Sequence, residues 1–222
     1  MVRNVLFLFI LFWGSLSAQT LRMGADETTR MYYPVIEELL KEAGLETELV
    51  VLPTGRSLFD ANSGYIDGEI WRVSSIKGEY TNLIPVPTPL RKVEFLVYYK
   101  PELGQLADLD DLEGKVFGIV RGVKAVELYL KEHKNKVIYT ENPEVLFTLL
   151  ESGRIDVAIA NRNFQKRPNY DSDIAFIEEP LINETVHLWL NKKHSSLIPQ
   201  IDEVLQNWGK SQLDEMFTFS QE

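Results

Sequence analysis

The chain has 222 residues, no cysteine and a formal net charge of −10 at pH 7. The missing thiol excludes disulfides, cysteine-ligated metal sites, a cysteine nucleophile and a lipid anchor on an N-terminal cysteine. The acidic balance argues against a nucleic-acid partner, because phosphate binding needs a basic face.

The N-terminus has the order of a secretory signal peptide. Residues 1–4 carry one positive charge, residues 5–13 are apolar, and small residues follow as far as Ala18. The apolar run is shorter than the ~20 residues that a transmembrane helix needs. We therefore predict a signal peptide over residues 1–18 and export to the periplasm. The alternative is an uncleaved N-terminal anchor.

The first part of the predicted mature chain alternates strands and helices. Apolar residues at helical spacing follow Pro34, and Gly44 ends that helix. Pro53 ends the second strand, and Ser63-Gly64 separates the second helix from the third strand. We predict strands over residues 21–26, 47–52 and 65–73, with helices over residues 34–43 and 56–62. This order opens a doubly wound α/β sheet.

The same order returns after residue 110. Asn142 caps a helix that Pro143 begins, and Gly153 stops it. We predict strands over residues 115–120, 137–139 and 155–160, with helices over residues 125–132 and 143–150. The segments that close the two halves also match: residues 63–70 read SGYIDGEI and residues 152–159 read SGRIDVAI. The repeat predicts two similar α/β lobes.

Two extended stretches indicate how the chain passes between these lobes. The proline-rich residues 84–90 fit neither a helix nor a central strand, and they lead into the apolar run 93–99. A matching run lies at residues 185–190, and pairing of the two runs would give two crossings. The C-terminal helix over residues 201–216 is expected to pack back on the first lobe. The predicted lobes are residues 19–91 plus 190–222, and residues 92–189.

This organisation resembles the family 3 extracytoplasmic solute-binding proteins of bacteria, whose best-known members bind polar amino acids. The chain is similar to them, as a divergent member, over essentially its whole predicted mature length. The resemblance is carried by LRMG at 21–24, SGYID at 63–67, LDDLEGKVFG at 109–118 and LESGRIDVA at 150–158. It implies a type II periplasmic-binding-protein-like α/β fold, in which two doubly wound lobes enclose a ligand cleft and two strands cross between them.

The same resemblance argues against a standard α-amino acid as ligand. Amino-acid-binding members hold the α-carboxylate with an Arg after the third strand and a Thr in the second lobe, and the ammonium with an Asp. The nearest matches in this chain are Lys77, Val123 and Asn161. A neutral Asn161 cannot replace the charge-assisted bond of a carboxylate to an ammonium.

Ligands of open α/β sheets lie at the carboxyl ends of the strands, and this rule selects the candidate residues. The predicted ligand-binding residues are Asp26, Tyr33, Arg56, Glu69, Trp71, Arg72, Arg121, Asn161 and Arg162. The planar fork of arginine suits carboxylate or phosphate, so four arginines favour an anionic or zwitterionic ligand. For Arg56 and Arg72 the alternative is pairing with surface carboxylates.

Aromatic residues supply the other part of the predicted cleft. Trp71 alternates with Ile70, which is expected to be buried, so Trp71 is expected to face the cleft. Tyr32 and Tyr33 precede the first helix, where one is expected to stack on the ligand and the other to cap the core.

The predicted mechanism is hinge closure of a monomer around the ligand, for uptake with an ABC-type permease or for signalling to a membrane sensor. Arg72→Ala and Arg121→Ala are each expected to weaken binding without unfolding the protein. The alternative is an enzyme on the same fold, similar to periplasmic cyclohexadienyl dehydratases, with Glu69 as its general acid.

No metal and no cofactor are expected. The three histidines, His133, His187 and His194, lie far apart in the sequence and lack a metal-ligand spacing. No serine lies in a Gly-x-Ser-x-Gly setting, so a nucleophile of that kind is not expected either.

Overall fold

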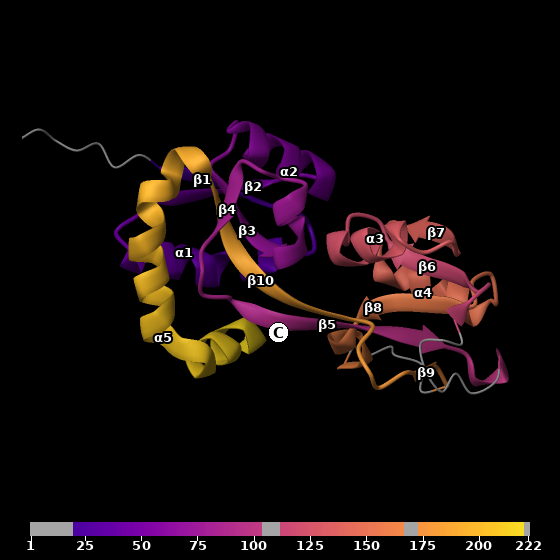
Figure 1. The fold of residues 1–222 in the computed structure, drawn as a ribbon. Coiled ribbons are helices and arrows are strands. Elements are labelled where there is room, and N and C mark those ends of the chain that lie inside the picture. Colours follow the sequence, from indigo (N-terminus) through magenta and orange to yellow (C-terminus); the bar gives the residue numbers. More distant parts are fainter. Residues whose placement is uncertain (1–19, 104–111, 167–172, 220–222) are drawn as a thin grey trace, which may run out of the picture.

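The computed structural model describes residues 20–103, 112–166 and 173–219. The elements form two groups that are joined by two long strands (Figure 1). The predicted signal peptide, and residues 109–111 of the segment that resembles family 3, lie outside the described residues. None of the helices in the described ranges has the length and hydrophobicity needed to cross a membrane.

The first group, lobe 1, contains the N-terminal elements and the C-terminal helix. Its strands are β1 (Leu21–Ala25), β2 (Thr47–Val51), β3 (Gly68–Val73) and β4 (Leu83–Pro85). Its α-helices are α1 (Tyr33–Glu42), α2 (Thr54–Ser63) and α5 (Ile198–Phe219). Short 3₁₀ turns, η1 (Arg30–Tyr32) and η2 (Ser74–Gly78), precede α1 and follow β3.

The second group, lobe 2, repeats the same βαβαβ order. Its strands are β6 (Val116–Val120), β7 (Lys136–Thr140), β8 (Val157–Asn161) and β9 (Ala175–Phe176). Its helices are α3 (Lys124–Lys131) and α4 (Pro143–Glu151). The predicted cap of α4 is confirmed, because the Asn142 side chain accepts a hydrogen bond from Val145 N at 2.9 Å.

The two predicted crossings are confirmed. β5 (Arg91–Tyr99) and β10 (Ile182–Asn191) run antiparallel between the lobes, from Ile182 opposite Phe95 to Val186 opposite Arg91. They stand at the centre of one continuous sheet with the strand order β2-β1-β3-β10-β5-β8-β6-β7. The domain limits between residues 91 and 92 and between 189 and 190 stay a prediction.

The repeated Ser-Gly-x-Ile-Asp segment has the same hydrogen bonds in both lobes. Asp67 N donates to Arg22 O at 2.8 Å, and Arg22 N donates to Asp67 Oδ2 at 2.8 Å. In lobe 2, Asp156 N donates to Val116 O at 2.9 Å and Val116 N donates to Asp156 Oδ2 at 2.6 Å. Each aspartate therefore fixes the start of the first strand of its lobe. Residues 65–67 are consequently a loop, and the third strand begins at Gly68 and not at residue 65.

The C-terminal helix packs on lobe 1 as predicted. Ile201, Leu205 and Leu213 of α5 lie in the same buried cluster as Ile36 and Leu39 of α1. The helix is not continuous, however, because it breaks at Gly209, whose φ of 65° and ψ of 169° suit glycine alone. The break turns the last part of α5 back toward β5 (Figure 1).

Candidate functional site

A cleft of about 470 Å³ lies between the lobes and is lined from both. This volume falls in the range of small-molecule sites. Its lining is largely apolar. The aliphatic lining residues are Met31, Val93, Val120, Val123, Pro143, Ile159 and Ala160.

Aromatic side chains line the cleft from lobe 1, β5 and lobe 2. The Tyr32 and Trp71 rings stack with centroids 4.0 Å apart and planes 17° apart. Phe217 of α5 contacts both rings edge-on, at 5.7 Å and 4.9 Å, and thereby supports the pair from lobe 1. Phe95 of β5 and Phe164 of lobe 2 also line the cleft.

Asp26 shapes the polar part of the lobe 1 wall. Its Oδ1 accepts hydrogen bonds from the backbone N of Thr28 and Thr29, at 3.1 and 3.0 Å, and from their hydroxyls at 2.7 and 3.0 Å. Thr28 and Thr29 line the cleft, whereas Asp26 does not. Asp26 therefore acts as a positioning residue for this turn.

Behind that turn lies a buried ion cluster of Asp26, Arg72 and Glu69. Arg72 Nη1 is 2.8 Å from Asp26 Oδ2, and Arg72 Nη2 is 2.8 Å from Glu69 Oε2. Ser57 Oγ donates to Glu69 Oε1 at 2.5 Å. The Glu69 side chain has an exposed fraction of 0% and that of Arg72 is 7%. Neither side chain lines the cleft, so both are part of the buried interior of lobe 1.

The pKa values of the two carboxyl groups in the cluster are shifted in opposite directions. Burial alone would raise the pKa of Asp26, but the charge of Arg72 and the hydrogen bonds from Thr28, Arg72 and Thr54 lower this pKa from 3.8 to about 2. Burial raises the pKa of the Glu69 carboxyl above its ordinary value, against the charge of Arg72 and the Ser57 hydrogen bond. For Glu69, burial and the nearby charge of Asp26 therefore outweigh the effect of Arg72 on the pKa.

The lowered pKa of Asp26 predicts an acid-labile contribution to stability. A pKa shift of this size is worth about 2–3 kcal/mol, which is present above pH 4 and is lost as the pH falls from about 4 to about 2. Urea unfolding of the wild type and of Asp26→Asn should therefore give a large difference in free energy at pH 7 and a small one near pH 2. A difference that stays constant from pH 5 to pH 2 would contradict the assignment.

Asn161, at the end of β8, lines the cleft from lobe 2. Its Oδ1 accepts a hydrogen bond from Asn163 N at 2.9 Å, which fixes the orientation of the amide. The group that remains for a ligand is the NH₂, which is a donor. Asn163 lines the same wall, and the N-terminal ends of α3 and α4 meet the cleft at Val123 and Pro143. The lobe 2 wall therefore offers donors and positive helix-dipole ends.

Arg91, the first residue of β5, is the one charged residue among the described residues that line the cleft. Its backbone is held opposite Val186 in the β5–β10 pair. The side chain is half-buried, and none of the described residues forms an ion pair or a hydrogen bond with its guanidinium. The cation is therefore available to an anionic ligand.

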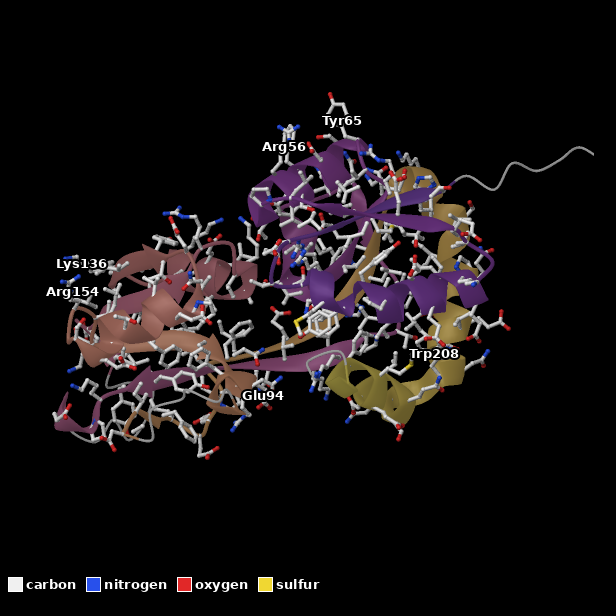
Figure 2. All side chains as sticks on the ribbon, turned by 180° about the vertical axis from the view of Figure 1, so that it is seen from behind. Arg56, Tyr65, Glu94, Lys136, Arg154 and Trp208 are labelled. Carbon is white, nitrogen blue, oxygen red and sulfur yellow. The ribbon has the colours of Figure 1, made fainter. Side chains whose placement is uncertain are left out.

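Of the nine candidates that the sequence selects, the structure brings Trp71 and Asn161 to the cleft and leaves the other seven elsewhere. Asp26, Glu69 and Arg72 form the buried ion cluster, and the remaining four lie outside both the cleft and the cluster. Arg56 projects from the outer surface of lobe 1 (Figure 2) and pairs with Asp60 at 2.8 Å. The Tyr33 hydroxyl lies 3.0 Å from Thr47 Oγ1 on β2, so it is Tyr32 that reaches the cleft.

The two remaining arginines have partners within lobe 2 or at its edge. The Arg121 guanidinium carbon lies 4.9 Å from the centre of the Tyr139 ring, and the residue is exposed. Arg162 pairs with Glu178 at 3.0 Å and with Glu94 of β5. Neither arginine lines the cleft.

The sequence did not identify Thr28, Thr29, Arg91, Phe95 and Phe164 as lining residues. Arg91 and Phe95 stand on a crossing strand, which the strand-end rule for parallel sheets does not cover. A usable signal for Arg91 was its place directly after the proline-rich segment, at the predicted passage between the lobes.

The lobes also touch at the rim of the cleft. Lys124 Nζ of α3 lies 3.7 Å from Glu79 Oε1 of lobe 1 and 6.0 Å from the centre of the Tyr80 ring. A Cβ atom on Gly122 would lie 3.0 Å from Thr54 Cβ of α2, so a larger residue there would push against lobe 1. These contacts join the two lobes next to Val123, which lines the cleft.

No protein-family model and no curated protein sequence matches the chain. Solved structures do match it. The ligand-binding core of GluR0 from Nostoc punctiforme, in complex with L-glutamate, has a TM-score of 0.73 and 15% identity over 89% of this chain and 97% of that one. The substrate-binding protein AbpA of an amino acid ABC transporter from Streptococcus pneumoniae, bound to L-arginine, has a TM-score of 0.72 and 16% identity over 90% and 94%.

A histidine kinase sensor domain, described as similar to periplasmic binding proteins, has a TM-score of 0.74 and 16% identity over 90% of this chain and 95% of that one. These similarities confirm the predicted fold, which is the two-lobed α/β fold of periplasmic-binding-protein type. The predicted resemblance to family 3 solute-binding proteins is borne out at the level of this fold. At these identities the likeness carries no information on the ligand.

Proposed function

We propose that the protein captures a small anionic or zwitterionic molecule between its lobes by hinge closure and releases it unchanged. The observation that carries this proposal is the composition of the cleft: an aromatic pair from lobe 1, amide donors from lobe 2, and Arg91 of β5, which has no ion-pair partner among the described residues. Parts of the site come from both lobes, so a ligand makes all of its contacts only when the lobes are together.

The hinge of this motion consists of β5 and β10, the two described strands that run between the lobes. Closure brings Lys124 to Glu79 and Tyr80, and Gly122 to Thr54, at the rim. Rim contacts of this kind are individually weak, about 0–1 kcal/mol for a partly exposed ion pair. Ligand contacts must therefore supply most of the free energy that favours the closed state.

The enzyme alternative finds little support in the cleft. Glu69, the carboxylate nominated as general acid, is fully buried against Ser57 and Arg72 and has no contact with the cleft. The structural neighbours reported above include binding proteins and a sensor domain. We therefore favour binding over catalysis. We further propose that the protein works as a monomer in the periplasm, with an ABC permease or a membrane sensor as partner.

A thermal-shift screen of amino acids, dicarboxylates, small peptides and sulfonates tests the proposal. Ligand at about 100 times its Kd adds about 2.7 kcal/mol to the stability of the native state, which for a chain of this size is a rise of several degrees in Tm. A compound that stabilises the protein should also reduce the radius of gyration in solution scattering, because it favours the closed lobes.

A cleft-filling variant and a matched control make the screen specific. Val123→Trp places a large side chain in the lining and should abolish the stabilisation, whereas Val145→Trp, at an exposed position of α4, should not. The proposal fails if no compound class stabilises the protein, or if Val123→Trp is stabilised as strongly as the wild type.

A further inference from the structure

The charges in the cleft restrict the ligand more closely than the fold does. Arg91 is the one charged side chain of the described lining, and neither aspartate nor glutamate contributes to it. Asp26, just before the lining turn, already accepts hydrogen bonds from Thr28, Thr54 and Arg72. An ammonium group in the cleft would therefore lose its hydration without meeting a carboxylate.

The amide on the opposite wall points to the same conclusion. Because Asn161 Oδ1 is occupied by Asn163 N, the NH₂ of Asn161 is the group left for a ligand. A donor of this kind favours a carboxylate oxygen and is unfavourable beside an ammonium. Arg91 and Asn161 thus both select for an acceptor, and the described lining contains no carboxylate that could pair with a cation.

The remaining surface suits a flat apolar body. Tyr32 and Trp71 stack as one aromatic platform, and Phe95 and Phe164 add two further rings to the lining. Aromatic pairs gain stability beyond the burial of area alone when their rings are offset or edge-on. The threonine hydroxyls of the Thr28–Thr29 turn donate to Asp26, so their protons are not available to a carboxylate of the ligand.

We propose that the ligand is an aryl-substituted carboxylate: a small molecule with an aromatic ring and one carboxylate, and without an ammonium group. This inference rests on the proposed function and names the class of ligand for the same cleft. The carboxylate binds Arg91, and the ring lies against the aromatic lining. An α-amino acid with the same ring is a poorer ligand because its ammonium has no partner.

Four small molecules that differ in one feature each test this inference by calorimetry. The probes are 3-phenylpropanoate, L-phenylalanine, 2-phenylethylamine and 4-methylpentanoate. We expect 3-phenylpropanoate to bind roughly 10- to 100-fold more tightly than L-phenylalanine, since an unpaired buried charge costs that much or more. 2-Phenylethylamine should not bind measurably, and 4-methylpentanoate should bind more weakly than 3-phenylpropanoate because it lacks the ring.

A pair of variants tests the aromatic platform. Trp71→Leu keeps an apolar side chain in the lining and should reduce the preference for 3-phenylpropanoate over 4-methylpentanoate by several-fold. Tyr65→Leu is the control, because Tyr65 is 69% exposed and lies on the outer surface of lobe 1 (Figure 2). An unchanged preference in Trp71→Leu would overturn the role of the platform.

The outcomes separate this inference from the proposed function. Tighter binding of L-phenylalanine than of 3-phenylpropanoate overturns the inference and leaves the proposed binding function standing. Equal binding of 4-methylpentanoate overturns the requirement for a ring. If none of the four probes binds while another compound class stabilises the protein, the inference is wrong and the proposed function holds. If nothing binds at all, both are wrong.

Discussion

Replacement of Arg72 by alanine is expected to unfold the protein or to lower its free energy of unfolding by about 3–5 kcal/mol. Arg72 lies between two carboxylates, 2.8 Å from Asp26 Oδ2 and 2.8 Å from Glu69 Oε2. Without the guanidinium, both carboxylates would remain buried with no compensating charge. This replaces the expectation from sequence, in which Arg72→Ala weakened ligand binding and left the fold intact.

Urea unfolding at several pH values measures this effect. Arg56→Ala is the matched control, because Arg56 also pairs with one aspartate of lobe 1 but has a side chain that is 63% exposed. Its loss should cost less than about 1 kcal/mol. The defect of Arg72→Ala should shrink as the pH falls and the two carboxylates become protonated. Equal unfolding midpoints for the two variants at pH 7 would show that the cluster does not stabilise the fold.

The architecture was predictable from the sequence because local and long-range signals agreed. Gly64 and Gly153 have φ values of 81° and 68°, so each repeat ends a helix in a left-handed conformation. The aspartates that follow them, Asp67 and Asp156, hold equivalent strands in the two lobes. The glycine and the aspartate of the repeat thus each have a local structural role, and such a pattern can be recognised without knowledge of the tertiary structure.

The site was less predictable, because its residues are selected by side-chain direction and by partners far away in the sequence. Tyr32 and Tyr33 are adjacent, and only their positions relative to Trp71 and Thr47 decide which of them meets the cleft. Arg72 follows Trp71 directly, yet its guanidinium enters the buried cluster because Asp26 and Glu69 are there. The sequence shows that the chain contains several arginines. Only the three-dimensional structure shows which of them has no carboxylate partner in the protein and can bind an anionic ligand.

Arg91→Gln is expected to weaken the binding of 3-phenylpropanoate roughly 10- to 100-fold, without a change in the unfolding midpoint. A hydrogen bond to a charged group contributes about 1.5–3 kcal/mol, and each 1.4 kcal/mol is a factor of ten in Kd. The fold should tolerate the change, since no described residue is an ion-pair partner of Arg91. Arg91 differs in this respect from Arg72, whose guanidinium pairs with two carboxylates of the protein itself.

Two comparisons test whether Arg91 binds the carboxylate of the ligand: Arg91→Gln against Arg121→Gln, and 3-phenylpropanoate against its neutral amide. Arg121→Gln removes an exposed arginine outside the cleft lining and should leave Kd unchanged. For wild type, 3-phenylpropanoate should bind more tightly than its neutral amide, and Arg91→Gln should abolish most of that preference. If Arg121→Gln removes the preference and Arg91→Gln does not, the anion is held from lobe 2, as the strand-end rule had suggested. The cleft would then have to close further than it does in this structure, because Arg121 lies outside its present lining.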